Sequence, residues 1–178
     1  MKTLIFTLSL CLFFSLAGFS QTREETEKWI AETLQANAQE YKTRQTFGED
    51  KSKGLQSFLT YSDFSFQFEE GYFIIHCKAS YPRYAGTDAV DNVVMRLPLW
   101  DLTIVSDAEE KVGDDTYNIS FGTISKAFLY VNESAKYNEP KWQFKIRVAA
   151  AGNEDLALKI KDAFNRVNKD LGNALTIR

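Results

Sequence analysis

The chain has 178 residues, of which 44% are hydrophobic and 25% charged, and its formal net charge is −3. This length suits one domain with a substantial core. The mildly acidic balance argues against nucleic-acid binding, because neutralising phosphates requires a basic face.

Residues 1–20 have the three-part pattern of a secretory signal peptide. Lys2 is their only charge, an apolar run extends from Leu4 to Ala17, and Gly18-Phe19-Ser20 offers small residues at the positions that a signal peptidase reads. The run is shorter than the roughly 20 apolar residues that a membrane span requires. We therefore expect export to the periplasm or the extracellular space, with a mature chain that begins at Gln21.

The two cysteines bear on how the mature chain is held together. Cys11 lies in the signal peptide, so Cys77 would be left alone and no intrachain disulfide could form. The segment before Cys11 resembles a lipobox only loosely, since Leu10 stands where a small residue is needed. Cleavage of the signal peptide is therefore favoured over lipidation of Cys11. Because no intrachain disulfide can form, the hydrophobic core must stabilise the domain.

Residues 21–54 predict a helix followed by a connector. Thr22 and Glu25 have the spacing of a capping box, which marks a helix start. The segment 42–54 is polar, contains Gly48 and Gly54, and reads as a connector. One helical stripe carries apolar residues, namely Trp29, Ile30, Leu34, Ala38 and Tyr41.

Residues 55–151 alternate with a period of two, which is typical of strands. Phe64, Phe66 and Phe68 share one face, residues 69–71 form a hairpin turn, and the return strand begins apolar on both faces. In the last strand we expect one face in the core and the other in water. The core face comprises Trp142, Phe144, Ile146 and Val148, and the water face comprises Lys141, Gln143, Lys145 and Arg147.

The C-terminal part of the chain predicts an amphipathic helix. Gly152-Asn153 would cap its start, Ile160 and Phe164 belong to its buried stripe, and Gly172 would end it. Together with the earlier elements, this gives an α+β fold. It has an N-terminal helix, an antiparallel sheet or barrel of about seven strands, and a closing C-terminal helix, with residues 55–178 forming one domain with 21–54.

Three stretches carry a resemblance to known proteins: residues 64–78, residues 96–102 and residues 153–172. They resemble uncharacterised exported bacterial proteins with a pleckstrin-homology-like barrel. The resemblance implies that fold and brings no catalytic residues with it.

No catalytic or metal-binding motif stands out in the chain. His76, the single histidine, and Cys77 should point to opposite faces of one strand, which prevents a direct pair. Zinc is disfavoured by the lack of further ligands. The acidic turn at 107–115 lacks the spacing of a calcium loop. We expect no catalytic residues, no cofactor and no metal.

The best candidate for a contact surface is the segment 81–92, interpreted as a loop with Pro82 and Gly86. Its Tyr81, Arg83 and Tyr84 are of the residue types that anchor interfaces and stack on sugars or cations. The alternative is that both rings fold back onto the barrel rim.

The interpretation we favour is an exported, non-enzymatic binding or scaffolding module. Its partner would be a protein, glycan or lipid outside the cytoplasm. A second interpretation is a carrier for a lipid or other apolar ligand, based on the 14% aromatic content. A third is a hydrolase that uses carboxylates. A large apolar cavity would support the carrier, and a cleft with two facing carboxylates would support the hydrolase.

The signal pattern generates a first prediction. The intact mass of the exported protein should correspond to a chain that starts at Gln21, because signal peptidase cleaves after small residues such as Ser20. A mass that retains residues 1–20, or a lipid adduct on Cys11, would contradict it.

Overall fold

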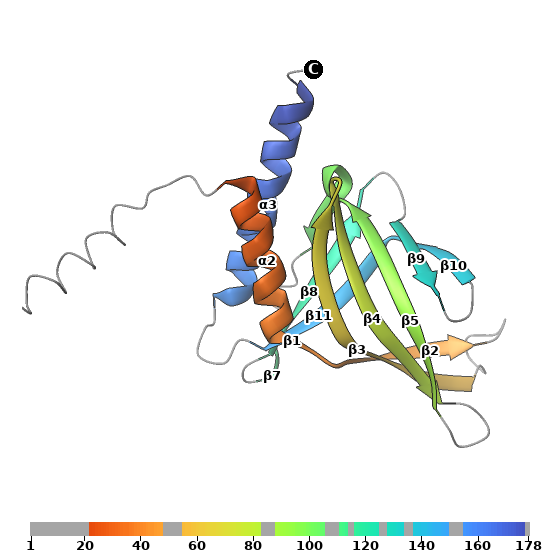
Figure 1. The fold of residues 1–178 in the computed structure, drawn as a ribbon. Coiled ribbons are helices and arrows are strands. Elements are labelled where there is room, and N and C mark those ends of the chain that lie inside the picture. Colours follow the sequence, from red (N-terminus) through yellow and green to blue (C-terminus); the bar gives the residue numbers. More distant parts are fainter. Residues whose placement is uncertain are drawn as a thin grey trace, which may run out of the picture.

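The computed structural model describes residues 22–47, 55–82, 88–105, 111–113, 116–124, 128–133, 137–149 and 155–176. They form an α+β structure of two helices and two antiparallel sheets, one of which curls into a half-barrel (Figure 1). The helices are α2 (Arg23–Asn37) and α3 (Leu156–Thr176). The other elements are β1 (Ala38–Gln39), β2 (Tyr41–Phe47), β3 (Leu55–Glu69), β4 (Tyr72–Pro82), β5 (Asp88–Pro98), the 3-10 turn η1 (Leu99–Asp101), β6 (Leu102–Val105), β7 (Lys111–Gly113), β8 (Thr116–Thr123), β9 (Phe128–Asn132), β10 (Tyr137–Lys141) and β11 (Gln143–Ala149).

The two sheets share segments of chain that pass from one into the other. The six-stranded sheet has the order β10-β9-β5-β4-β3-β2, and the five-stranded sheet has the order β1-β11-β8-β6 with β7 beside β8. The chain crosses between them from β1 to β2, from β5 through η1 to β6, from β8 to β9 and from β10 to β11. At one side the two sheets are connected because β1 pairs with β11 and β2, which continues β1, pairs with β3.

Helix α2 begins with the predicted capping box. The Thr22 hydroxyl accepts a hydrogen bond from the Glu25 backbone N–H, and the Glu25 carboxylate accepts one from the Thr22 N–H. Ile30 and Leu34 are fully buried. Gln35 Nε2 donates to the Phe64 carbonyl at 2.8 Å, so α2 satisfies a backbone group of β3 beyond the residues that β2 pairs.

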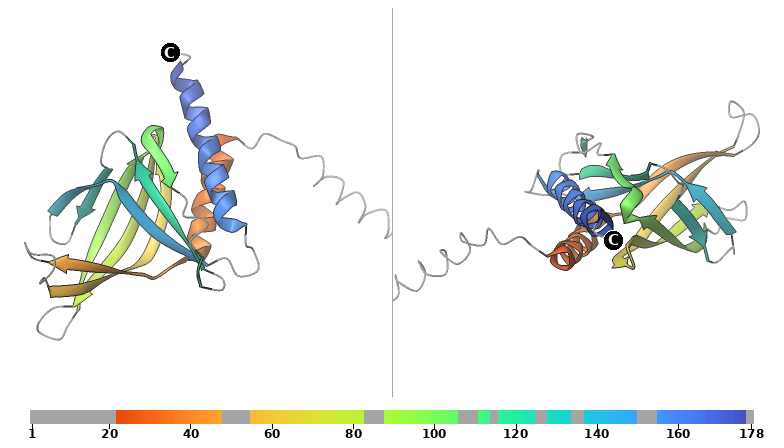
Figure 2. Two further views of the ribbon diagram at one scale, coloured as in Figure 1. Left: turned by 180° about the vertical axis from the view of Figure 1, so that it is seen from behind. Right: turned by 90° about the horizontal axis from the view of Figure 1, so that it is seen from above.

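The core is centred on aromatic rings contributed by both sheets and by α3. The Phe73 ring lies 5.3 Å from that of Phe121 and 5.0 Å from that of Phe164, both measured between centroids. Phe164 comes from α3, which lies beside α2 in both views (Figures 1 and 2). The predicted closing helix is therefore confirmed, and its buried stripe comprises Leu156, Ala157, Ile160, Ala163, Phe164 and Val167.

The hairpin between β3 and β4 is built as the sequence predicts. Glu70 and Gly71 have φ values of 50° and 82°, which suit a tight two-residue turn. A bulge in β3, between Ser62 and Ser65, shifts the alternation, with Asp63 at φ 52°. As a result Tyr61 and Phe64, three residues apart, both belong to the core.

The chain bends at Trp142, and the predicted faces of the last strand are wrong at Trp142 and at the preceding Lys141. Phe144, Ile146 and Val148 are buried as expected, but Trp142 is 57% exposed. Lys141 lies directly opposite the buried Phe128, and paired residues share a face. Lys141 is therefore on the concave face, because the alternation restarts where the chain changes sheets.

Three further boundaries differ from the sequence-based prediction. The segment expected as a polar connector contains β2, whose polar residues form an edge strand. The segment expected as a loop from residue 81 is shorter, since β4 continues to Pro82 and β5 begins at Asp88. Helix α3 passes through Gly172 and ends at Thr176, with its last turns projecting past the sheets (Figure 1).

The ring cluster predicts a large stability difference between two aromatic residues. Phe164→Ala should lower the free energy of unfolding by about 3–5 kcal/mol, because it leaves a cavity among packed rings. Trp142→Ala, the control, should cost less than about 1 kcal/mol, because the side chain is mostly exposed. Urea denaturation measures both, and equal losses would contradict this assignment of the core.

Candidate functional site

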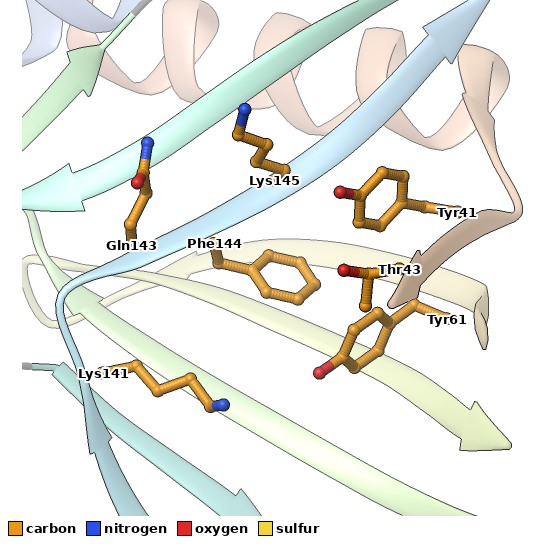
Figure 3. Close-up of a pocket in the computed structure, with 7 residues that line it drawn as sticks. All are labelled: Tyr41, Thr43, Tyr61, Lys141, Gln143, Phe144 and Lys145. Carbon is orange, nitrogen blue, oxygen red and sulfur yellow. The ribbon is translucent and has the colours of Figure 1, made fainter. Parts of the chain in front are cut away.

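Strands β2 and β11 part from each other, and a cavity lies between them. We call this cavity the fork. The cavity volume is about 330 Å³. Its described lining residues, drawn in Figure 3, are Tyr41, Thr43, Tyr61, Lys141, Gln143, Phe144 and Lys145.

The fork arises from a change of partner within one stretch of chain. Ala38 pairs with Val148 and Gln39 with Arg147, so a continued register would place Glu40 opposite Ile146 and Tyr41 opposite Lys145. From Tyr41 on, the chain pairs with β3, and β2 is not paired with β11. The edges of β2 and β11 therefore diverge, and the cavity lies between residues that would otherwise have been paired.

Aromatic rings form the inner wall of the fork. Tyr61 and Phe144 meet edge to face at 5.1 Å between centroids, and both are buried. The Tyr41 ring is half-buried, with the Arg147 guanidinium 5.4 Å from its centroid. These contacts join the fork to the core, so its wall is held by packing.

Two lysines flank the fork on opposite sides of the chain. Figure 3 shows Gln143 and Lys145 pointing to one side of the strand and Lys141 to the other. The Lys141 ammonium lies 4.7 Å from the centroid of the Tyr130 ring on the concave face. Among the described residues that line this cavity, two are lysines and none is a carboxylate, and such a lining favours a negatively charged ligand.

A buried polar cluster lies elsewhere on the concave face. Asp91 is 7% exposed, and its Oδ2 accepts hydrogen bonds from the Tyr81 hydroxyl at 3.2 Å and from Asn132 Nδ2 at 2.8 Å. Three neighbouring strands, β4, β5 and β9, contribute these residues. Both hydrogen bonds go to Oδ2, and together they fix the position of the carboxylate.

The contact surface predicted from sequence is described only in part. Tyr81 is half-buried at the end of β4, where it packs against the core and donates to Asp91. Arg83 and Tyr84 lie outside the described residues. The surface of Tyr81, Arg83 and Tyr84 stays a prediction.

His76 and Cys77 occupy opposite faces of β4, as the sequence predicts. His76 Nε2 lies 3.3 Å from Gln67 Nε2, in an exposed contact. Cys77 is buried in the core cluster. Burial raises the pKa of the Cys77 thiol to about 12, so the residue is a poor nucleophile at neutral pH.

Among the described residues, no group of three or more His, Cys, Asp or Glu side chains is placed to hold a metal ion. The acidic turn at 107–115 falls largely outside that part of the chain. Within the described residues, no helix is long and apolar enough to cross a membrane.

Sequence reasoning missed the fork residues. Lys141 and Lys145 read as one solvated face, and Tyr41 as part of a helical stripe. The signal that was present is the change from helical to alternating spacing of the apolar residues near residue 38.

A scan against family models, a search of curated proteins and a search of solved structures each find no match to this chain.

The buried thiol generates a prediction on pH dependence. The Cys77 pKa is raised from 9.0 to about 12 in the folded protein, so the unfolded chain loses this proton at lower pH. The stability that Cys77 contributes should be constant below pH 9 and fall above it, by at most about 1.4 kcal/mol per pH unit. Urea melts of the wild type and Cys77→Ala should show a difference that shrinks above pH 9. A constant difference would contradict it.

Proposed function

We propose that the protein is an exported, non-enzymatic binding module that holds a negatively charged ligand in the fork. The observation that carries this proposal is the pair of lysines, Lys141 and Lys145, which line the cavity from opposite faces of one stretch of chain, with no carboxylate among the described lining residues. Arrangements of this kind attract anions and raise their local concentration. The partner, expected outside the cytoplasm, would be a protein, glycan or lipid with an acidic group.

The rigidity of the wall supports a binding role. Tyr61 and Phe144 contact each other and belong to the core, so this part of the fork exists before a ligand arrives. A preformed site loses little conformational entropy on binding. The size of the cavity falls at the lower end of ligand-binding clefts.

The carrier of an apolar ligand is less well supported. The described cavity is lined mainly by lysine, glutamine, threonine and tyrosine. The interior between the sheets and α3 is filled by contacting rings, including Phe73, Phe121 and Phe164. An apolar guest would have to displace them.

The carboxylate hydrolase is also less well supported. Asp91 and Asp101 are the buried carboxylates among the described residues. Asp91 lies in β5, whose last residue is Pro98, and Asp101 follows that strand. The stretch of β5 from Asp91 to Pro98 alone spans roughly 20 Å at about 3.3 Å per residue, so the two carboxylates are not arranged as a close pair. Glycosidase carboxylates stand about 5 to 9.5 Å apart.

We infer a pleckstrin-homology-like barrel as the framework that presents this site. Support comes from antiparallel strands in two sheets, from a chain that crosses between these sheets, and from a C-terminal helix packed on the core. Helix α2 is an addition to that framework. The fold alone implies no ligand, so the argument for binding stands on the fork.

Small anions test the proposal. Added citrate should shift the amide NMR resonances of Thr43 and Gln143 saturably, because its carboxylates would be attracted to the fork lysines. Glycerol should not. Lys145→Glu should abolish the shifts, whereas Lys169→Glu, an exposed position on α3, should leave them unchanged. Equal shifts in all three proteins, or none at the fork, would overturn it.

A further inference from the structure

We propose that the outer face of the six-stranded sheet, at the turn between β3 and β4, binds a neutral glycan on the exposed ring of Trp100. We call this surface the Trp100 corner and define it by Glu69, Tyr72, Arg96 and Trp100. It shares none of the described residues that line the fork. The inference therefore goes beyond the proposed function and does not depend on it.

The turn η1 holds the Trp100 ring toward solvent. Its two neighbours in the chain, Leu99 and Asp101, are buried, whereas Trp100 itself is 55% exposed. The Leu99 N–H donates to the Gly71 carbonyl at 2.9 Å, and the Asp101 carbonyl accepts from the Ile124 N–H at 3.2 Å. The backbone on both sides of Trp100 is thus fixed by contacts with other segments of the chain.

The inner side of the Trp100 ring packs against the β3–β4 hairpin. A Cβ atom on Gly71 would lie 3.5 Å from Trp100 Cζ3, so the indole lies close against the turn. The Tyr72 ring meets it edge to face at 5.1 Å between centroids. These contacts hold the ring in one orientation, and a ligand would bind a preformed surface at a low cost in conformational entropy.

Two side chains of opposite charge flank Tyr72 on the same face of the sheet. Glu69 of β3 is paired directly with Tyr72, and paired residues share a face. Arg96 of β5, on the other side of β4, has its guanidinium 5.0 Å from the centroid of the Tyr72 ring. Both charged residues are exposed. Hydrogen-bond acceptors therefore lie on one side of the rings and donors on the other.

This combination of groups fits a sugar better than a membrane or a charged ligand. A pyranose ring has C–H groups on its faces, which pack on an aromatic ring, and hydroxyls at its edge, which both donate and accept hydrogen bonds. The opposite charges of Glu69 and Arg96 favour a ligand without net charge. Insertion into a bilayer would bring the carboxylates of Glu69 and Glu70 toward hydrocarbon, which is costly.

Neutral hexasaccharides test the inference. Cellohexaose, maltohexaose and chitohexaose are titrated into the exported protein, and the indole N–H resonance of Trp100 is followed by NMR. At least one of the three should shift this resonance saturably. Hexagalacturonate, a charged chain of the same length, should bind no more tightly than the best of them, because Glu69 repels its carboxylates.

Two exposed tryptophans provide a matched pair of variants. Trp100→Ala should weaken binding of the best hexasaccharide by at least about tenfold, whereas Trp142→Ala should change the affinity by less than about twofold. Trp142 is similarly exposed but lies at the bend between β10 and β11. If Trp100→Ala does not fold, Trp100→Phe, which keeps a smaller aromatic face, should bind with intermediate affinity.

Substitution of Glu69 separates hydrogen bonding from charge. Glu69→Gln keeps a planar acceptor and should retain affinity within about twofold, whereas Glu69→Ala should weaken binding by more than about threefold. Equal losses in both variants would mean that the carboxylate charge is what the ligand recognises, and the neutral-glycan inference would be wrong.

Three other results would overturn the inference. The first is that none of the three hexasaccharides shifts the Trp100 resonance. The second is that Trp142→Ala weakens binding as much as Trp100→Ala, which would place the glycan on a different surface. The third is that phosphatidylcholine vesicles perturb Trp100 while the glycans do not, which would make the corner a membrane contact. The citrate shifts at the fork are read at Thr43 and Gln143, so either proposal can fail without the other.

Discussion

The segment that follows α2 pairs first with one sheet and then with the other, and the rest of the structure depends on this change of partner. The chain leaving α2 pairs with β11 for two residues and then with β3 from Tyr41 onward. This change of partner is one of the places where the chain passes from one sheet into the other. The seven residue pairs between β2 and β3 hold β2 in the six-stranded sheet, away from β11. The fork is therefore held open by the same hydrogen bonds that hold the curled sheet together.

The part of β3 that β2 does not pair is covered by α2. There Gln35 donates to the Phe64 carbonyl, and the buried Ile30 and Leu34 fill the space that a neighbouring strand would leave. Helix α3 then packs beside α2 and inserts Phe164 among the rings of both sheets. Where the helices pack, the gap between the sheets is thus filled with apolar side chains. At the fork, the gap is open and has a largely polar lining.

Local sequence signals account for much of the fold. The capping box at Thr22, the two-residue turn at Gly71 and the alternation from Phe144 to Val148 depend on neighbouring residues, and all three are present in the structure. The bulge at Asp63 and the bend at Trp142 depend on pairing with distant strands, and both change which face a residue occupies. The fork residues could not be grouped in advance, because the partner of Tyr41 lies 20 positions along the chain.

The bend at Trp142 also decides the chemistry of the fork. Had the alternation continued unbroken, Lys141 and Lys145 would both face water. Solvent-exposed lysines contribute little interaction energy with an opposite charge. The bend turns Lys141 to the concave face beside Tyr130 and leaves Lys145 on the outer side. A ligand between the diverging edges would then meet cations on both faces, with rings as its wall and backbone groups at its sides. Charged, apolar and hydrogen-bonding groups lie together there because the chain changes sheets on both sides of the fork, between β1 and β2 and between β10 and β11.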